Sequence, residues 1–583
     1  MNQWNRAFFR NVWQLSKGFW SSSVRWRMIA CAAAIAAAQA IYVSIMVNYN
    51  AWQKDFYNTI EAADPASFFY YLKFWPMYMV IFIFIEVNRD YVMQYLEIKW
   101  RTWLVNDFVK HWLSGRAYYL MQLVGQGAGE KLDNPDQRIA DDVRLFVSYV
   151  LNLSLGLLNA VMKLSSFGAV LWGLSGVVTV PIGNGFALAG YMVWIAIVYA
   201  LLGSGLTLWA GRPIVRLNNK QQEYEADFRF GLARLRDHFE SIAFYHGEAQ
   251  EEVGAMRRFE YVRRNFRRLM LRQMGLSWVT SLHWRVGFLF PFLVGVPRVF
   301  SGDMQFGGLF QTSVAFQQVV NSLSFLVLRY YSTTEASIAQ LQTVVHRLTD
   351  FRRRIEEAER TMQEAPAHLQ RGDVLAVYDL AVERPEGGVL VEHLSLDIAP
   401  GRHLFISGPS GRGKSTLLKA MAGIWPYAAG EIVLPERGSI LFLPQKPYLP
   451  LGNLRDALLY PSSGETVADG AIREALRCVR LEALADNLDQ EENWAHALSP
   501  GEQQRLAFAK ILLLKPAWVF LDEATSSLDE ENESLMYKLV LEQSPQTTLL
   551  SIGHRMSLRF FHKQHLKLGE GASWQLTEVK ERD

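Results

Sequence analysis

Long apolar runs dominate the first 350 residues of this chain. They lie at residues 28–47, 74–87, 145–172, 186–210, 276–296 and 309–328. A helix that crosses the ~30 Å hydrocarbon core of a bilayer needs about 20 such residues, and most of the runs are close to that length. Acidic and basic residues crowd the end of the second run, which leaves a buried soluble helix as the alternative there. The pattern predicts six membrane-spanning helices.

The segment before the first run also has a helical pattern. Trp4, Phe8, Val12, Leu15 and Phe19 recur at helical spacing, with basic residues between them. This spacing predicts a helix that lies in the membrane interface, or one that packs on protein. We do not expect a signal peptide, because the apolar run that follows is longer than the ~7–15 residues of a signal core.

Basic residues predict the orientation in the membrane. The stretch before the first run has no acidic residue and contains Arg6, Arg10, Lys17, Arg25 and Arg27. Further basic clusters occupy residues 99–138 and 212–272, whereas the links at 48–66, 179–185 and 298–307 contain few basic residues. Because Lys and Arg favour the cytoplasmic side, we expect both termini to be cytoplasmic.

Two of the polar stretches are long enough to extend well beyond a bilayer. In the first, Asn134-Pro135-Asp136 predicts a helix start, with Asn134 as the cap and Pro135 at the first helical position. In the second, residues 223–240 form a mixed-charge helical face, followed by the apolar Ile242-Ala243-Phe244-Tyr245. We expect both stretches to act as levers, although a solvated charged helix explains most of the single charges.

Several charged or titratable side chains fall within the predicted spans. They are Lys163, His283, Arg285 and Arg329. Such residues usually face protein or water, since burial in lipid is costly. A role in lining a substrate path and a structural ion pair or snorkelling both remain open for Lys163.

The rest of the composition excludes some functions. The net charge of +2 gives no indication of nucleic-acid binding, and Cys31 and Cys478 are too far apart in context to suggest a disulfide framework or a metal site. A charged helical stretch at residues 352–364 precedes β-branched, alternating residues from about Val374. These features predict a soluble α/β domain after the membrane block.

A phosphate-binding loop follows a buried strand in this second part. Leu404–Ser407 predicts the strand, and the loop consists of Gly408, Pro409, Ser410, Gly411, Arg412, Gly413, Lys414 and Ser415, with Thr416 opening a helix. Backbone amides of such a loop surround phosphate oxygens, Lys414 neutralises charge, and the Ser415 hydroxyl suits Mg²⁺. The loop predicts ATP binding.

A second apolar strand, residues 518–521, ends in Asp522 and Glu523. We expect Asp522 to hold Mg²⁺ and Glu523 to polarise the water that attacks the γ-phosphate. Gln445 is expected near the metal or this water, and His554, after the predicted strand at residues 548–552, near the γ-phosphate. Each of these residues alone is weak evidence for an ATPase site, but their order around the phosphate loop favours one.

Together with the peptide Leu498-Ser499-Pro500-Gly501-Glu502-Gln503-Gln504-Arg505, these segments resemble the nucleotide-binding domain of ABC transporters. The resemblance implies that Ser499 and Gly501 contact the γ-phosphate bound by a second copy, and that Asp529 links the two copies. It implies a homodimer in which each chain has six spans. We expect a helical membrane domain at residues 1–350, a linker at 351–372 and an α/β P-loop ATPase at 373–583.

The membrane block also resembles a known group. Residues 134–139, 240–248 and 422–427 resemble the SbmA/BacA-like transporters with an attached ATPase, and also the peroxisomal long-chain acyl half-transporters. The first likeness implies ATP-driven movement of a hydrophilic solute, such as a peptide or corrinoid, across the bacterial inner membrane. A long-chain acyl substrate and a proton-coupled carrier with a regulatory ATPase are the alternatives.

Two positions depart from the general ABC pattern. Pro500 stands at a position of the signature peptide that is usually glycine. In this respect the chain resembles the SbmA/BacA-like transporters with an attached ATPase. The aromatic residue that usually stacks on adenine is missing, and Arg384 and Pro385 stand in its place. The sequence therefore leaves the partner of the adenine base open.

Overall fold

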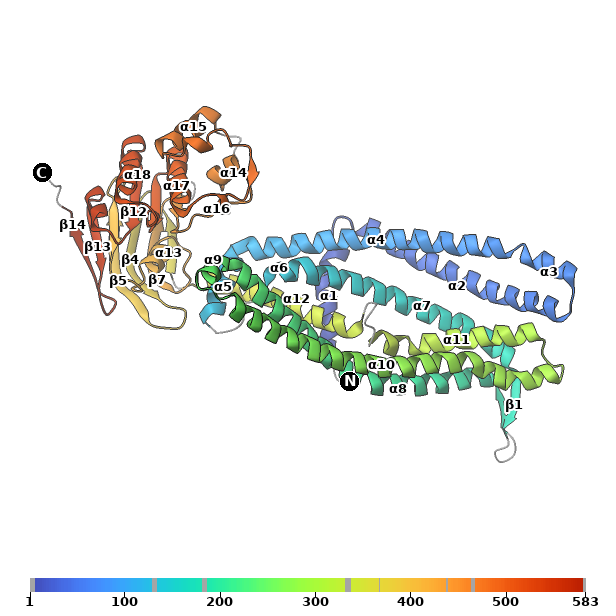
Figure 1. Ribbon diagram of the computed structural model, residues 1–583. Coiled ribbons are helices and arrows are strands. Elements are labelled where there is room, and N and C mark those ends of the chain that lie inside the picture. Colours follow the sequence, from blue (N-terminus) through green and yellow to red (C-terminus); the bar gives the residue numbers. More distant parts are fainter. Residues whose placement is uncertain are drawn as a thin grey trace. The chain divides into compact units, whose positions relative to one another are not determined.

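The computed structural model describes residues 6–127, 134–180, 186–330, 337–365, 367–436, 439–462 and 467–579. The chain divides into two compact units, which Figure 1 shows coloured along the sequence. Residues 1–113 and 133–354 form the first, here called the helical unit, and residues 114–132 and 355–583 form the second, here called the α/β unit.

The helical unit is built from long helices joined by short links. Its elements are α1 (Arg6–Trp20), α2 (Arg25–Glu61), α3 (Pro65–Leu72), α4 (Trp75–Leu113), α6 (Pro135–Gln137), η2 (Arg138–Asp142), α7 (Val143–Ser175), β1 (Val177–Val180), β2 (Phe186–Ala189), α8 (Tyr191–Asp237), α9 (Phe239–Phe244), α10 (Glu248–Phe300) and α11 (Phe306–Tyr330). Helix α12 (Ile338–Gln363) begins in this unit and ends in the next. Asn134 stands at the N-cap of α6, as expected, but its side chain makes no capping hydrogen bond.

Five of the expected spans coincide with helical stretches that are long and apolar enough to cross a bilayer. Among the described residues these stretches are Arg25–Glu61, Pro65–Leu123, Pro135–Ser175, Tyr191–Asp237 and Glu248–Phe300. The expected start of the fourth span is wrong, because Phe186–Ala189 forms strand β2, which pairs antiparallel with β1, and the helix begins only at Tyr191. A run of apolar residues this short fits a strand and a helix equally well, because its periodicity does not distinguish them.

The sixth expected span is the single helix α11, which is more polar than the other five. Its buried side chains include Gln311, Thr312, Ser313 and Ser324. The helix contacts α2, α7, α8 and α10. A helix surrounded by protein in this way needs less apolar surface than one that faces lipid.

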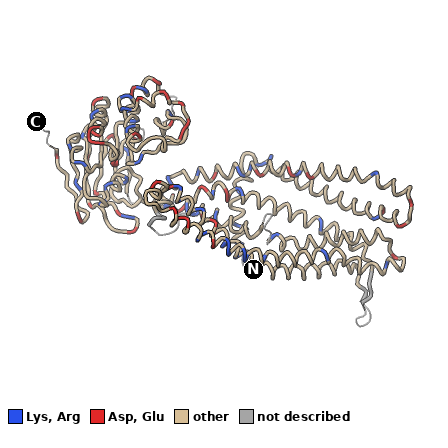
Figure 2. Tube along the Cα trace, in the orientation of Figure 1, with Lys and Arg blue, Asp and Glu red and all other residues tan. Residues whose placement is uncertain are grey.

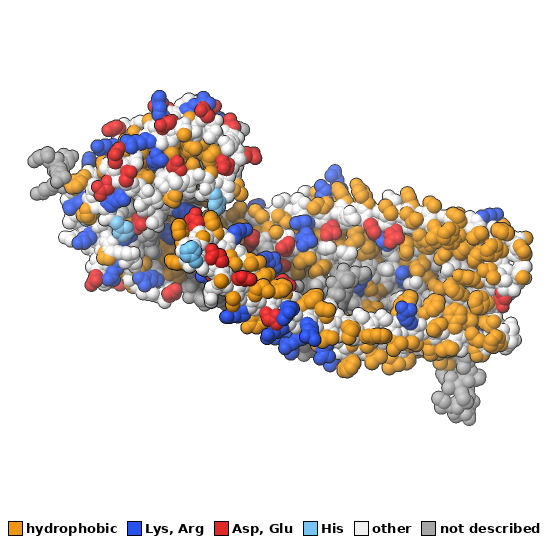
Figure 3. Space-filling model, in the orientation of Figure 1, with side chains coloured by type: hydrophobic (Ala, Val, Ile, Leu, Met, Phe, Trp, Pro, Cys, Tyr) orange, Lys and Arg blue, Asp and Glu red, His pale blue; other side chains and the backbone are white. Residues whose placement is uncertain are grey.

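Helices α8 and α10 are far longer than a bilayer requires. They contain 47 and 53 residues, which corresponds to roughly 70 and 80 Å at 1.5 Å per residue. Asn265 of α10 fastens them together by donating to the Leu217 carbonyl and to Gln221, both at 2.9 Å. Hydrophobic side chains gather at one end of the helical unit (Figure 3), and charged residues gather along α8 and α10 toward α9 (Figure 2). The second of the two stretches expected to act as levers, residues 212–272, therefore lies on the adjoining parts of α8 and α10 and on the short helix α9 between them.

Helix α1 packs on protein at its C-terminal end. Leu15 and Phe19 are buried, and the Phe19 ring stacks on Trp100 with 5.3 Å between the ring centroids. Phe9 and Trp13 are exposed. The sequence predicts that this helix lies in the membrane interface or packs on protein. The end near Phe19 packs on protein, and the exposed residues Phe9 and Trp13 remain available to contact a membrane surface. Trp4 lies outside the described residues.

The α/β unit contains two larger sheets. A six-stranded sheet has the order β14-β13-β6-β12-β11-β8, and a four-stranded sheet has the order β3-β7-β4-β5. The strands are β3 (Ala367–Arg371), β4 (Leu375–Glu383), β5 (Val389–Ile398), β6 (Leu404–Ser407), β7 (Ala428–Leu434), β8 (Ile440–Leu443), β9 (Gly452–Asn453), β10 (Glu491–Glu492), β11 (Trp518–Asp522), β12 (Thr548–Ile552), β13 (Gln564–Leu568) and β14 (Trp574–Glu578). The helices are η1 (Ser114–Arg116), α5 (Ala117–Gly127), α13 (Lys414–Met421), α14 (Leu454–Leu459), α15 (Asp469–Cys478), η5 (Glu482–Leu484), α16 (Trp494–Ala497), α17 (Pro500–Leu514), α18 (Glu530–Gln543) and η6 (Met556–Phe561).

Two segments of the α/β unit come before residue 373, where the sequence predicts this domain to begin. Strand β3 falls within the expected linker and pairs in parallel with β7. Helix α5 comes between α4 and α6 of the helical unit, yet its Leu123 packs against the core that contains Leu417 and Trp425. This unit therefore draws on a part of the chain that lies between predicted spans.

The start of α11 offers a test of how the helical unit packs. The backbone N–H groups of Phe306 and Gly307 donate to Glu61 and Asn58 of α2, both at 2.9 Å. A Cβ atom on Gly307 would lie 2.0 Å from the Lys54 carbonyl oxygen. We therefore expect Gly307→Ala to destabilise the protein by about 1–3 kcal/mol, in the range typical of overpacking.

The measurement is thermal unfolding of the detergent-solubilised full-length protein. Gly173→Ala is the matched control, because a Cβ there meets nothing within 4 Å. Equal midpoints for the two variants would contradict this packing.

Candidate functional site

The phosphate loop has the geometry that the sequence predicts. It connects β6 to α13, and Gly413 adopts the left-handed conformation with φ of 84°. A Cβ on Gly408 would lie 2.7 Å from the Leu568 carbonyl oxygen, so only glycine fits this close approach. The buried Lys414 donates from Nζ to the carbonyl oxygens of Gly408 at 2.9 Å and Pro409 at 3.1 Å. The lysine therefore lies inside the curve of the loop.

A cavity of about 460 Å³ opens at this loop, which is within the range typical of nucleotide-sized ligands. Its wall consists of Leu123, Arg384, Pro385, Glu386, Leu390, Ser410, Gly411, Gly413, Lys414, Ser415, Thr416, Trp425 and Glu523. Most of the predicted loop residues thus line it. Arg412 instead forms an ion pair with Glu570 at 3.2 Å.

The predicted metal ligands meet at the end of β11. The Ser415 hydroxyl donates to Asp522 Oδ1 at 2.7 Å. Burial raises the pKa of Asp522, while the hydrogen bond from Ser415 acts in the opposite direction. A hydroxyl and a carboxylate are oxygen ligands of the kind that Mg²⁺ prefers, so the residues fit this ion. The described ranges contain no group of three or more His, Cys, Asp or Glu residues that could hold a metal ion by themselves.

Glu523 lies between the other two predicted catalytic residues. Its carboxylate contacts His554 Nε2 at 2.9 Å and accepts from Gln445 Nε2 at 3.2 Å. The Glu523 backbone is left-handed with φ of 50°, an unfavourable conformation for a residue with a side chain. Strain of this kind often occurs at functional sites. The structure therefore brings Gln445, Glu523 and His554 together, as the sequence predicts.

The signature peptide forms the start of α17. Ser499 caps the helix in a reciprocal capping box, because its Oγ accepts from the Glu502 N–H at 3.4 Å and its own backbone N–H donates to Glu502 Oε2 at 2.9 Å. The hydrogen bonds from Ser499 lower the pKa of Glu502. Asp529 caps α18 by accepting from the Asn532 N–H at 2.7 Å. None of Ser499, Gly501 and Asp529 belongs to the described wall of the nucleotide cavity.

Sequence reasoning gave no role to Gln504, which is almost fully buried. Its amide donates to the Gln445 carbonyl oxygen at 3.1 Å and to Ser526 Oγ at 3.2 Å, and it accepts from the Ser527 N–H at 2.9 Å. The residue thus ties the signature helix to the loop of Gln445 and to the segment before Asp529. A buried polar residue within a functional peptide is the signal that indicates such a role.

In the described part of the helical unit, two cavities have several polar side chains in their walls and are here called polar cavities. One of about 310 Å³ lies between α8, α10 and α11 and includes Ser204, Thr280, His283, Arg285 and Asn321 in its wall. His283 Nε2 is buried without a hydrogen-bond partner in the described part of the chain. Two of the charged residues singled out from the sequence, His283 and Arg285, are therefore neighbours here, whereas Lys163 and Arg329 are not in this wall.

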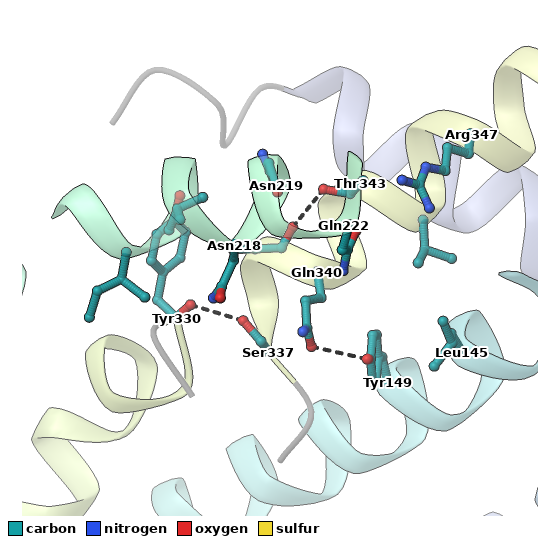
Figure 4. Close-up of a pocket in the computed structure, with 14 residues that line it drawn as sticks. Leu145, Tyr149, Asn218, Asn219, Gln222, Tyr330, Ser337, Gln340, Thr343 and Arg347 are labelled. Atoms are coloured by element: carbon teal, nitrogen blue, oxygen red, sulfur yellow. Dashed lines mark hydrogen bonds between the residues drawn. The ribbon is translucent and has the colours of Figure 1, made fainter. Parts of the chain in front are cut away.

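The second polar cavity, shown in Figure 4, is small. It has a volume of about 70 Å³ and is lined with amides such as Asn218, Asn219 and Gln222. Tyr149 donates to Gln340 Oε1 at 3.0 Å across its wall. A space of this size holds a few water molecules rather than a solute.

Comparisons with known proteins identify both units. Residues 16–300 match the family described as ABC transporter transmembrane region 2, and residues 391–526 match the family described as ABC transporter. An uncharacterized ABC transporter ATP-binding protein of Haemophilus influenzae is 35% identical over 98% of this chain and 94% of its own length. The chain belongs to the ABC transporters. It is a half-transporter, with a membrane domain and an ATPase domain fused in one polypeptide, and it hydrolyses ATP.

Two further likenesses define its position in the family. The human lysosomal cobalamin transporter ABCD4 is 29% identical over 83% of this chain and 82% of its own. The structure of a bacterial Atm1-family ABC exporter with ATP bound superposes with a TM-score of 0.72, covering 94% of this chain and 95% of that one, at 16% identity. The chain is thus related to the D-type transporters and has the fold of the Atm1-family exporter.

Proposed function

We propose that two copies of this ABC transporter form a homodimer that couples ATP hydrolysis to the movement of a hydrophilic solute across a bacterial inner membrane. One observation supports the proposed dimer. Lys414 and Ser415 line the nucleotide cavity, whereas Ser499 and Gly501 are not in its described wall. A second copy that presents its Ser499 to this cavity completes the site, and the reciprocal contact completes the other.

The residues around the cavity have distinct roles in this proposal. Lys414 neutralises charge on the bound phosphates, and Ser415 and Asp522 hold Mg²⁺, which supplies charge neutralisation for phosphoryl transfer. Glu523 polarises the attacking water. Its contacts with Gln445 and His554 hold the carboxylate in place at 3.2 and 2.9 Å.

The larger polar cavity supports a hydrophilic solute. Hydroxyl and amide side chains accompany Arg285 in its wall, and in the described part of the chain Arg285 forms no hydrogen bond or ion pair. A charged group in a membrane domain usually marks a substrate path or a functional partner. The human relative is named a cobalamin transporter, and the SbmA/BacA-like resemblance also indicates peptide or corrinoid cargo.

A long-chain acyl substrate is the second candidate, and a separate cavity favours it. An apolar cavity of about 470 Å³ lies among α1, α2, α4 and α7, with Trp13, Trp20, Leu96, Trp100 and Leu155 in its wall. Apolar lining of this kind accommodates acyl chains.

Basic residues support the proposed orientation in the membrane, and exposed apolar residues support the proposed contact between two copies. In this proposal the basic residues along α8 and α10 (Figure 2) lie on the cytoplasmic side of the bilayer. Both termini and the ATPase are cytoplasmic as well. Phe244, the last residue of α9, and Tyr245, which follows it, are 82% and 85% exposed. Large apolar side chains this exposed suit a contact with the second copy.

Glu523→Gln tests the coupling of hydrolysis to transport. The amide cannot accept a proton from water, so we expect hydrolysis to fall at least about a hundredfold while ATP binding persists and the closed dimer accumulates. Glu542→Gln, which changes an exposed residue of α18, is the matched control. Hydrolysis at the parental rate in reconstituted membranes contradicts the assignment. Solute uptake that survives both Glu523→Gln and Lys414→Ala, yet stops with an uncoupler, favours the proton-coupled carrier.

Arg285→Gln tests the solute class in proteoliposomes. If hydrophilic cargo uses the polar cavity, this variant reduces ATP-dependent transport of labelled cobalamin or peptide several-fold and leaves ATP binding intact. Ala36→Trp fills the apolar cavity and serves as the counterpart. Loss of acyl-CoA transport on Ala36→Trp, with no transport of hydrophilic probes by the parent protein, supports the acyl candidate instead.

A further inference from the structure

Two groups of residues form most of the wall of the nucleotide cavity. One is the phosphate loop, with Ser410, Gly411, Gly413, Lys414, Ser415 and Thr416, and the other consists of Leu123, Arg384, Pro385, Glu386, Leu390 and Trp425. When the phosphates of a nucleotide lie on the loop, its base is left to contact residues of the second group. Binding a flat purine at such a place requires a surface that contacts its face.

Trp425 is the one aromatic residue in the described wall, and it is already held by contacts with the protein. Trp425 is 8% exposed, and its indole Nε1 donates to the Glu383 carbonyl oxygen at 2.8 Å. It packs against Tyr427 edge-on, with 67° between the rings. Trp425 is thus fixed in the floor of the cavity, and the face of the base needs other partners.

Arg384 is held beside the phosphate loop by hydrogen bonds of its backbone and its side chain. It lies on the turn between β4 and β5, where Arg384 N donates to the Gly388 carbonyl oxygen and Gly387 N donates to that of Arg384, both at 3.1 Å. The turn requires positive φ at Gly387 and Gly388, of 88° and 100°. One guanidinium nitrogen donates to the Gly411 carbonyl oxygen at 3.3 Å. A guanidinium is planar and delocalised, so it stacks on aromatic rings.

Leu123 reaches the same cavity from α5. The segment before α5 is anchored on the α/β unit, since Arg116 donates to the Gly423 carbonyl oxygen at 3.0 Å and Ser114 donates to Glu359 at 2.6 Å. Leu123 then packs beside the core of this unit. An apolar side chain from a segment that lies between two predicted spans therefore forms part of the wall near the base.

We propose that the adenine of ATP is held between the guanidinium of Arg384 and the side chain of Leu123, so that helix α5 is part of the nucleotide site. Occupancy of the base position then stabilises the docked α5, and docking of α5 tightens nucleotide binding by the same factor, because linkage is reciprocal. Stacking contacts the face of a base and not its edges, so GTP binds nearly as well as ATP. This inference is independent of the transported solute.

The test compares binding of ATP with binding of inorganic triphosphate, which has the phosphates and lacks the base. Both are titrated by calorimetry into the full-length protein without Mg²⁺, so that hydrolysis does not interfere. We expect Arg384→Ala to weaken ATP binding about tenfold, as loss of one stacking partner should. Triphosphate binding should change less than twofold, and this also shows that the loop remains folded.

Further variants separate stacking from charge. Arg384→Tyr should restore ATP affinity because it presents an aromatic face, whereas Arg384→Lys keeps the charge and should behave like Arg384→Ala. Leu123→Ser should weaken ATP binding about threefold, and Gln122→Ser, its exposed neighbour on α5, should not.

Two results would overturn the proposal. Equal losses for ATP and triphosphate on Arg384→Ala, or rescue by Arg384→Lys, would make Arg384 a phosphate contact. Unchanged ATP affinity on Leu123→Ser would remove α5 from the site.

Discussion

Parallel pairing of β6, β12, β11 and β8 is the constraint on which the nucleotide site depends. In this arrangement Phe520 lies opposite Leu550 and Phe442, and Leu550 lies opposite Leu404. The carboxyl ends of all four strands consequently meet at one edge, where ligands bind in sheets of this type. The phosphate loop follows β6, Gln445 follows β8, Glu523 follows β11 and His554 follows β12. The fully buried Phe405, Phe520 and Leu550 keep these four ends in register.

The signature helix is fastened to this edge by side chains and not by strand pairing. Gln504 joins α17 to the backbone of Gln445 and to Ser526 and Ser527. Gln503 fixes the preceding turn by donating to the carbonyl oxygens of Ala495 and Leu498, both at 2.9 Å. In the proposed dimer, a contact of Ser499 with the second copy would act on the helix that Gln504 joins to Gln445, the residue that contacts Glu523. These hydrogen bonds would then connect closure of the proposed dimer to hydrolysis.

The parts of the site that the sequence predicts are those fixed by local order. A strand, a glycine-rich loop and a helix in succession determine where Lys414 and Ser415 lie, and a strand that ends in acids determines Asp522. Residues brought in by tertiary packing were not predicted. Leu123 is separated from Arg384 by two thirds of the membrane block in sequence, and nothing in its own neighbourhood indicates a nucleotide.

The same distinction applies to the fold. Long runs of apolar residues predict helices reliably, because few other structures satisfy a lipid environment. The short stretch at Phe186–Ala189 forms a strand because it pairs with β1, and this pairing is not visible in a local pattern. Helix α11 is more polar than the other expected spans because other helices surround it, and β3 joins a sheet whose partner strand β7 lies more than fifty residues later.

Complementation between two inactive copies tests the central claim most directly. Lys414→Ala inactivates the phosphate loop of one copy, and Ser499→Arg blocks the signature peptide of the other, so each variant alone should form dimers without a working site. Co-expressed and purified through two different tags, the mixed dimer contains one intact loop facing one intact signature. The account predicts that this mixed dimer regains ATP hydrolysis, up to about half the parental rate. Hydrolysis by the Ser499→Arg protein alone, or none in the mixed dimer, would contradict it.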